Sequence, residues 1–550
     1  MRKFIFLFFS LIFFSCSPKQ QVDLIIHNAV IYTVDSSFSK AESFAISDGK
    51  FVAVGGNSDI LNNFTAKEII DVQGKTIYPG FIDSHCHFYG YGKGLQEVNL
   101  TRTKSFDEVI NRVVEYSKTN ESEWIIGRGW DQNDWENKEF PTKKELDSLF
   151  PHTPVFLQRI DGHAALANNE AISRCHFEIK NKVEGGIVEM INNQLTGIFI
   201  DNAVDLLKKE IPNSSKEEIK SSLLAAQKNC FAVGLTTFDD AGLDKNIIDE
   251  MDALQKSTEL KIRIYAMLSD TKENLDYYLQ HGTYKTDRLN VRSFKFYADG
   301  ALGSRGACLL KPYKDKPNQQ GFLLNSPDYF KENAKKVFEK GFQMNTHCIG
   351  DSAVRLICTV YSNTLISNST ASPAPLSYRW RIEHSQVVNP NDIKYYSGII
   401  PSVQPTHATS DMYWAKDRIG DERIKYAYAY NDLLKTTGII ALGTDFPVED
   451  INPIYTFYAA VARKDLKGFP KEGFQMENAL SRENTLKGMT IWGAYANFEE
   501  KEKGSIELGK FADFIILDTD IMKCEIDKVP ATKVISTYIN GECVYSLKQN

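Results

Sequence analysis

The segment FIDSHCHF, residues 81–88, decides the fold because it joins a buried strand to a pair of histidines. An apolar run over residues 77–82 leads into Asp83, His85 and His87. Side chains two positions apart in an extended chain point to the same side, so both imidazoles face the same space. Two neutral imidazoles in that arrangement can bind one metal ion. The segment therefore predicts a strand whose carboxyl end carries part of a metal site.

Seven more short apolar runs along the chain end, like the first, in polar or charged residues. Buried parallel strands are typically continuous apolar runs of this kind, without strict alternation. Stretches with helical spacing, such as residues 215–232 and 326–341, lie between them. The predicted strands are residues 77–82, 233–239, 261–269, 292–298, 342–348, 378–384, 398–404 and 438–445. Eight strand–helix units predict an α/β fold of the TIM (β/α)8 barrel type.

The two ends of the chain and one long internal segment follow other patterns. Residues 22–78 alternate apolar and polar side chains in short runs separated by turn residues, as do residues 504–520 and 533–546. These ends predict meanders of short strands. Residues 95–220 do not fit into the series of eight strand–helix units. We therefore expect them to form an insertion after the first strand that caps the barrel mouth.

Composition places the chain among globular proteins. Its 550 residues are 42% hydrophobic and 25% charged, which argues against a disordered, collagen-like or coiled-coil protein. The net charge is −7, so basic residues are not in excess and we expect no binding to nucleic acid. Eight of the nine cysteines are scattered without a CxxC pair, and we interpret them as buried free thiols.

The N-terminus reads as a targeting segment. Arg2 and Lys3 precede an apolar run over residues 4–14, which is too short to span a bilayer. Cys16 follows, so residues 1–15 resemble a bacterial lipoprotein signal peptide with a lipid attached at Cys16. An ordinary signal peptide or an uncleaved anchor is the alternative. We expect a lipoprotein of the bacterial cell envelope, attached to the membrane through that lipid alone and facing the periplasm or the exterior.

Further polar residues lie at the ends of the predicted strands. In a parallel barrel such positions converge on one pocket. Imidazole and carboxylate ligands suit zinc and similar divalent ions, whereas a charged lysine would repel a cation. Lysine can take part only when neutral or converted by CO2 to a carbamate. The six candidates are His85, His87, Lys295, His347, His384 and Asp445.

Each candidate also has a structural interpretation. A strand-end histidine can be a hydrogen-bonded core residue, Lys295 can pair with Asp299 or Glu383, and Asp445 can cap the helix that follows it. Their joint placement at strand ends is harder to explain by structure alone.

Six motifs together resemble one known family. They are YPGFIDSHCHF (78–88), FKFYADGALGSRGA (294–307), NTHCIGDSAV (345–354), RIEHSQ (381–386), GTDFPV (443–448) and GSIELGKFADFIILD (504–518). The chain resembles the amidohydrolase superfamily, in the branch of the N-substituted formamide deformylases (amidohydrolase family 3). The resemblance implies a TIM barrel (77–94 and 221–499), a small β-sandwich built from both chain ends (22–76 and 500–550) and a cap (95–220).

The resemblance also implies a metal centre, usually of two Zn2+ ions. His85, His87 and Asp445 would bind the more buried ion, and His347 and His384 the other. Carbamylated Lys295 would bridge the two ions. The implied reaction is hydrolysis of a non-peptide C–N bond, in an amide or formamide, by metal-activated hydroxide. Asp445 would act as the proton shuttle to the leaving nitrogen.

Weaker candidates lie around the predicted barrel mouth. His163 is a candidate catalytic residue that would hold the substrate or its carbonyl oxygen, with a loop contact as the alternative. Candidate substrate-binding residues are Asp161, Trp130, Trp135, His407, Asp299 and Arg305. The tryptophans could instead pack inside the cap, and Asp299 and Arg305 could form an ion pair that shapes their loop.

Two other functions are weighed against amide hydrolysis. A mononuclear-metal deaminase shares the barrel and the histidine pair, but Cys348–Asp351 provide no HxxE motif. A ligand-binding lipoprotein on an inactive barrel is the non-enzymatic alternative. The presence of all six candidate metal ligands argues against it. Glycine-rich phosphate cradles, an SxxK motif and a GxSxG elbow are absent from the sequence. The expected partner is a small-molecule amide, and a homodimer is possible.

Overall fold

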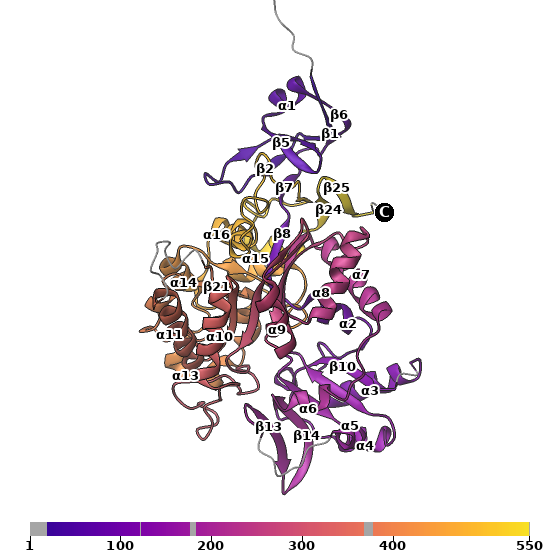
Figure 1. Ribbon diagram of the computed structural model, residues 1–550, viewed down its shortest axis with the longest axis vertical. Coiled ribbons are helices and arrows are strands. Elements are labelled where there is room, and N and C mark those ends of the chain that lie inside the picture. The colour runs from indigo at the N-terminus through magenta and orange to yellow at the C-terminus, as the bar shows by residue number, and fades with distance from the viewer. Residues whose placement is uncertain (1–18, 121–122, 176–182, 368–377, 549–550) are drawn as a thin grey trace, which may run out of the picture.

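The computed structural model describes residues 19–120, 123–175, 183–367 and 378–548. Three parts follow one another along its longest axis: a β-sandwich at one end, a barrel in the middle and a cap at the other end (Figure 1). The predicted lipidation site, Cys16, lies outside the described residues. In the described part of the chain, no helix is long and apolar enough to cross a membrane.

The central part is a TIM barrel, as predicted. Its parallel strands have the spatial order β22-β21-β20-β19-β18-β16-β15-β8. Backbone hydrogen bonds from His87 N to Phe446 O and from Asp445 N to His85 O, both 2.8 Å long, join the first strand to the chain after the last. The strands are β8 (Phe81–Cys86), β15 (Leu235–Leu243), β16 (Arg263–Ser269), β18 (Leu289–Tyr297), β19 (Gln343–Cys348), β20 (Arg381–His384), β21 (Ile400–Val403) and β22 (Ala441–Leu442). A short strand, β17 (Tyr284–Lys285), pairs with β18.

The first predicted strand divides into two. Residues Thr76–Pro79 form β7, which pairs with β23 in the sandwich, and the barrel strand β8 begins only at Phe81. Gly80 lies between them, where an added Cβ would be 2.2 Å from Thr236 Oγ1. This close approach requires glycine at the point where the chain passes from one domain to the next.

Helices cover the outside of the barrel. The helix α7 (Lys216–Ala232) begins at Ser215 with a capping box to Glu218, and α10 (Pro327–Glu339) begins at Ser326 with proline in its first turn. Both match the predicted helical stretches. The others are α2 (Phe88–Gly94), α8 (Lys245–Lys256), α9 (Lys272–His281), α11 (Asp351–Ser367), α12 (Pro405–Asp411), α13 (Ala415–Arg423), α14 (Tyr430–Thr437), α15 (Pro453–Ala462), α16 (Arg482–Gly488) and α17 (Ile491–Ala496).

The β-sandwich combines both chain ends. Its first sheet has the order β5-β4-β1-β6 and its second β25-β24-β23-β7-β2-β3. Aromatic rings from both ends pack in its core, where the Phe44 and Phe514 centroids lie 4.9 Å apart. The elements are β1 (Gln20–His27), β2 (Val30–Tyr32), β3 (Lys40–Ala41), β4 (Ser43–Ser47), β5 (Lys50–Gly55), α1 (Asn57–Asn63), β6 (Phe64–Asp71), β23 (Phe514–Leu517), β24 (Val534–Ile539) and β25 (Glu542–Ser546).

The insertion after the first barrel strand forms a mixed sheet with its own hydrophobic core. The strand order is β13-β14-β12-β11-β10-β9. These strands are β9 (Val98–Asn99), β10 (Ile125–Trp130), β11 (Val155–Arg159), β12 (Ala164–Ala167), β13 (Gly186–Ile191) and β14 (Gln194–Asp201). Its helices are α3 (Phe106–Ser117), α4 (Lys144–Leu149), α5 (Asn169–Arg174) and α6 (Val204–Lys208).

Candidate metal centre and pocket

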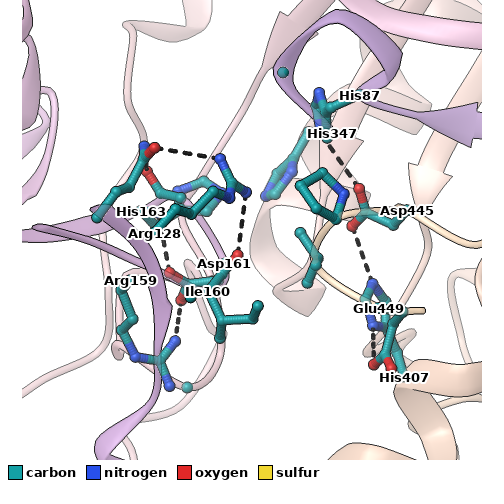
Figure 2. Close-up of a pocket in the computed structure, with 18 of the residues that line it drawn as sticks. His87, Arg128, Arg159, Ile160, Asp161, His163, His347, His407, Asp445 and Glu449 are labelled. Atoms are coloured by element: carbon teal, nitrogen blue, oxygen red, sulfur yellow. Dashed lines mark hydrogen bonds and ion pairs between the residues drawn. The ribbon is translucent and has the colours of Figure 1, made fainter. Parts of the chain in front are cut away.

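A cavity of about 1600 Å3 opens between the barrel and the cap. Side chains from the carboxyl ends of the barrel strands form its floor, and cap residues form the facing wall (Figure 2). Five of the six predicted metal ligands line it: His87, Lys295, His347, His384 and Asp445. The sixth, His85, is fully buried directly behind them.

The six side chains lie close together. His87 Nε2 is 3.3 Å and His85 Nε2 is 3.7 Å from Asp445 Oδ1. Lys295 Nζ is 3.2 Å from His85 Nε2. The His384 ring centroid lies 4.7 Å from that of His85 and 4.5 Å from that of His347. The barrel strands thus bring together side chains that lie as much as several hundred positions apart in the sequence.

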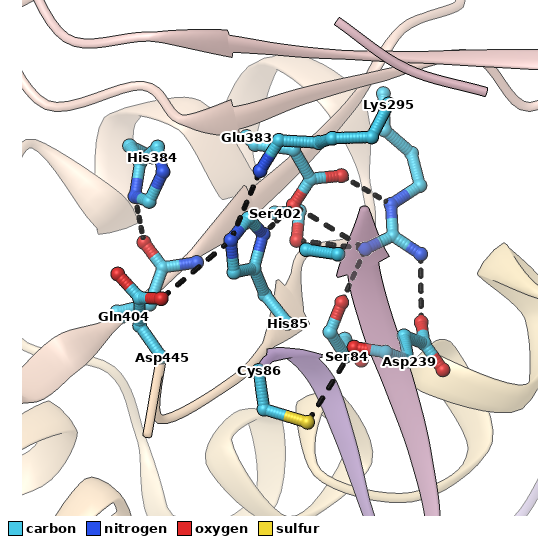
Figure 3. A network of polar contacts seen from close by, with 12 residues as sticks. Ser84, His85, Cys86, Asp239, Lys295, Glu383, His384, Ser402, Gln404 and Asp445 are labelled. Atoms are coloured by element: carbon cyan, nitrogen blue, oxygen red, sulfur yellow. Dashed lines mark hydrogen bonds and ion pairs between the residues drawn. The ribbon is translucent and has the colours of Figure 1, made fainter. Parts of the chain in front are cut away.

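A buried charge chain orients His85 (Figure 3). His85 Nδ1 lies 2.5 Å from Glu383 Oε2, and Arg381 Nε donates to Glu383 Oε1 at 2.8 Å. Arg381 Nη1 continues the chain to Asp239 Oδ2 at 2.8 Å. Because the ionised carboxylate can only accept, His85 Nδ1 carries the proton and Nε2 offers its lone pair to the centre. Sequence reasoning missed this role, although Arg381 and Glu383 inside a buried strand were a signal.

Neutral and charged partners hold the other ring nitrogens. His384 Nδ1 donates to Gln404 Oε1 at 2.8 Å, which leaves Nε2 free. His407 lies between two carboxylates, with Nε2 3.1 Å from Asp445 Oδ2 and Nδ1 3.0 Å from Glu449 Oε1. Its own burial opposes protonation, but these two hydrogen bonds raise the pKa of His407 well above its usual range. His407 therefore lines the pocket as a positively charged support for Asp445.

The residues present fit a divalent metal ion. Two sets have ligand atoms that all lie within 4.8 Å of one another: His85, His87 and Asp445, and His384, His407 and Asp445. His347 Nε2 and Asp445 Oδ1 are buried without a hydrogen-bond partner, although such groups are normally paired. Unpaired donor atoms of this kind are what a metal would coordinate.

The charge states at the centre favour metal binding as well. Burial lowers the pKa of His85 to about 4 and the pKa of His347 and His384 well below the usual value, so the rings are neutral ligands. Burial alone would raise the pKa of Asp445, but the hydrogen bond with His407 and the nearby His87 ring hold it well below its usual range. The centre thus combines neutral imidazoles with an ionised carboxylate.

Two predicted residues of the cap also face the cavity. Asp161 lines the wall and pairs with Arg159. His163 lies with its ring centroid 5.0 Å from that of His347, and its Nδ1 is 2.7 Å from Asp201 Oδ1. Asp201, at the end of β14, was not predicted from the sequence.

The predicted stacking role of Trp130 and Trp135 is corrected by the structure. Both rings are buried in the cap core, and neither lines the cavity. Trp130 Nε1 donates to Leu157 O at 2.8 Å and Trp135 Nε1 to Thr103 O at 3.1 Å. Their polar atoms are satisfied internally, so these side chains pack the cap and do not stack on a substrate.

The predicted substrate-binding role of Asp299 and Arg305 is corrected too, because neither lines the cavity. Asp299 is fully buried and accepts backbone N–H groups of Cys308, Ile349 and Gly350 at 2.8–3.0 Å. Arg305 Nη2 pairs with Asp315 Oδ2 at 2.8 Å. Both residues shape the loop after β18, though not as an ion pair with each other.

Comparison with known proteins agrees with this architecture. The sequence model described as "Amidohydrolase family" matches residues 68–545. The chain is 32% identical to the protein LONG AFTER FAR-RED 3 of Arabidopsis thaliana, covering 95% of this chain and 91% of the relative. It is 24% identical to the N-substituted formamide deformylase of Arthrobacter pascens, covering 96% and 99%.

A solved structure resembles most of the chain. The crystal structure of an uncharacterized metal-dependent hydrolase from Pyrococcus horikoshii OT3 has a TM-score of 0.74 and 28% identity, covering 92% of this chain and 99% of that one. The predicted resemblance is therefore confirmed: the chain belongs to the amidohydrolase family, whose relatives include metal-dependent hydrolases.

Proposed function

We propose that the protein hydrolyses a non-peptide C–N bond in a small amide or formamide. The observation that carries the proposal is the cluster at the pocket floor, where five histidines, Asp445 and Lys295 meet. Two of its buried atoms, His347 Nε2 and Asp445 Oδ1, accept or donate no hydrogen bond within the described residues. The formamide deformylase among the relatives is consistent with this bond type.

The proposed cofactor is a pair of divalent metal ions, with zinc as the first candidate. His85, His87 and Asp445 would hold one ion, and His347 and His384 the other. A bound ion would polarise the substrate carbonyl and lower the pKa of a water molecule. Glu383 and Gln404 keep the two Nε2 atoms directed at the centre, because each accepts the proton of the opposite ring nitrogen.

Asp445 is the proposed proton shuttle. Its Oδ2 is fixed by His407, while Oδ1 faces the centre without a hydrogen bond. The carboxylate would take a proton from the attacking water and pass it to the amide nitrogen. That transfer is required because an amide nitrogen leaves readily only once it is protonated. On the facing wall, His163 would hold the substrate carbonyl oxygen beside His347.

Lys295 is proposed to become the bridge as a carbamate. Burial lowers the pKa of Lys295 to about 8, so part of the population carries a neutral amine. The Nζ lone pair would attack CO2 to form an N–C bond, with loss of one proton from nitrogen. The product is a carboxylate-like anion in place of a cation, which reverses the charge that Lys295 presents to the ions.

An activity screen with matched variants tests the proposal. Zinc-loaded protein should release amine from at least one of a panel of N-formyl, N-acyl and cyclic amides, and metal analysis should find near-stoichiometric zinc. Asp445→Asn should lower kcat by about 1,000-fold or more. Asp450→Asn is the control, because Asp450 lines the same pocket but forms its ion pair with Arg102 and not with a residue of the cluster. Absence of bound metal, or full activity in Asp445→Asn, would refute the mechanism.

We also propose that Cys16 carries the lipid anchor and keeps the protein in the bacterial cell envelope. The first sandwich strand starts at Gln20, at the opposite end of the molecule from the cap (Figure 1). An anchor at Cys16 would therefore leave the pocket facing away from the attachment point. Radiolabelled palmitate should label the wild-type protein but not Cys16→Ser, which should move to the soluble fraction.

A further inference from the structure

A buried carboxylate of the cap holds His163 from behind. Asp201 is the last residue of β14, and its side chain is fully buried. Its backbone N–H donates to His163 O at 2.7 Å, and its Oδ1 lies 2.7 Å from His163 Nδ1. Because an ionised carboxylate can only accept, Nδ1 carries the shared proton. The two hydrogen bonds join the same pair of residues through backbone and side chain, so they fix both the place of His163 and the rotation of its ring.

The same carboxylate packs against the barrel loop that follows β18. A Cβ added at Gly300 would lie 2.5 Å from Asp201 Oδ1, and one added at Gly306 would lie closer still to Oδ2. Neither glycine has a positive φ, so space and not conformation requires glycine at these two positions. Asp201 Oδ2 is buried and has no hydrogen-bond partner among the described residues. Two glycines of the motif FKFYADGALGSRGA therefore leave room for a side chain of the cap.

That loop is in turn tied to the strand that carries His347. Asp299, beside the first of these glycines, accepts the backbone N–H groups of Ile349 at 3.0 Å and Gly350 at 2.8 Å, just after the end of β19. The ring centroids of His163 and His347 lie 5.0 Å apart. Buried contacts thus lead from the cap histidine through the carboxylate and the loop back to the floor histidine, and they set the spacing of the two rings.

The free nitrogen of His163 faces the cavity. Its Nε2 forms no hydrogen bond within the part of the chain that the structure describes, and the 15% of the side chain that is exposed lines the cavity. The terminal torsion of a histidine has a broad, roughly two-fold preference, so an unheld ring can turn over and exchange a nitrogen for a carbon. The hydrogen bond to Asp201 selects one of these orientations.

Resting on the proposed amide hydrolysis, we propose that Asp201 is a positioning residue that holds His163 Nε2 toward the substrate carbonyl oxygen beside His347. The carboxylate itself is shielded from the cavity, so it acts through the histidine and not on the substrate. Its role on the cap wall parallels that of Glu383 on the floor, where a buried carboxylate behind His85 determines which ring nitrogen faces the cavity.

A double-mutant cycle on zinc-loaded protein tests the kinetic consequence. On any accepted amide, His163→Gln should lower kcat/KM by about 100-fold, as for the loss of one donor to a reacting carbonyl oxygen. Asp201→Ala should lower it by about tenfold or more. Adding Asp201→Ala to His163→Gln should change it by less than about twofold, because the two residues act as a unit. Asp201→Asn should retain part of the activity, because its amide oxygen can still accept from Nδ1.

The neighbouring residue provides the matched control. Asn202 Nδ2 donates to Leu324 O at 3.0 Å, so Asn202→Ala also removes a contact between cap and barrel but does not touch His163. Its kcat/KM should stay within about twofold of the wild type. An Asp201→Ala effect that is equally small, or one that multiplies with the effect of His163→Gln, would overturn the proposal.

A spectrum separates this inference from the proposed reaction. In 1H–15N spectra of zinc-loaded protein labelled with 15N-histidine, the His163 signals are those that vanish in His163→Gln. The wild type and Asn202→Ala should show a protonated Nδ1 protected from exchange with water, and Asp201→Ala should lose that signal. This pattern supports the positioning role even if no tested amide is hydrolysed. A protected Nδ1 proton that persists in Asp201→Ala would overturn it, whatever the activity.

Discussion

The floor and the wall of the pocket are built on different principles. On the floor, a continuous chain of buried charges from Asp239 through Arg381 and Glu383 fixes His85. On the wall, Arg128 is held by one amide oxygen and one backbone carbonyl. A network of fully buried charges tolerates little change, whereas a side chain held by neutral contacts can be exchanged at lower cost. The floor thus holds His85 through buried charges, whereas the wall holds Arg128 through neutral contacts.

Breaking the floor at its proposed bridge should have the largest effect. Lys295→Ala removes the side chain that would hold the ions as a carbamate, so we expect kcat to fall by about 1,000-fold or more. Metal analysis should show less than half of the wild-type zinc. Lys208→Ala, at an exposed lysine of the same pocket, is the matched control. Wild-type metal content in Lys295→Ala would show that the lysine is only structural.

Weakening the charge chain behind the floor should have a smaller effect. Glu383→Gln leaves the shape of the side chain but removes the charge that holds the His85 Nδ1 proton. We expect metal affinity to fall by about 10- to 100-fold, as for other partners of metal-bound histidines. Competition with a zinc chelator measures the change. Affinity equal to the wild type would contradict the orienting role of Glu383.

The cap core should affect stability without affecting chemistry. Trp130→Ala removes a buried ring and the hydrogen bond to Leu157 O, so the free energy of unfolding should fall by about 3–5 kcal/mol. Urea titration followed by circular dichroism measures it. Below the unfolding transition, kcat should stay within about twofold of the wild type. A raised KM with unchanged stability would instead restore the stacking role that the structure argues against.

The smallest effect is expected at Arg305. Its ion pair with Asp315 is partly exposed, and Arg418 also pairs with Asp315. Arg305→Gln should therefore cost about 1 kcal/mol or less in unfolding free energy, and kcat/KM should not change measurably. Steady-state kinetics on any accepted amide decides this. A tenfold rise in KM would place Arg305 at the substrate after all.

Local patterns were sufficient for most of the barrel. Continuous apolar runs identified all eight strands, and polar residues at their ends identified the six side chains that meet at the floor. Strand periodicity and the convergence of parallel strands at one barrel face are general properties of backbone geometry, so they can be predicted from sequence. The boundary at Gly80 was missed because it depends on the close approach of Thr236, which is distant in the chain.

What the sequence by itself determined, then, is the set of strands and the kind of chemistry at their ends. Only the tertiary structure decided which partner each polar group has: Glu383 with His85 across 298 positions, and Asp201 with His163 across 38. It also decided that Trp130 points into the cap core and Arg128 into the cavity, two residues apart on one strand. The reason is physical, because a single bulge at Gly129 reverses the alternation on which any prediction of side-chain direction depends.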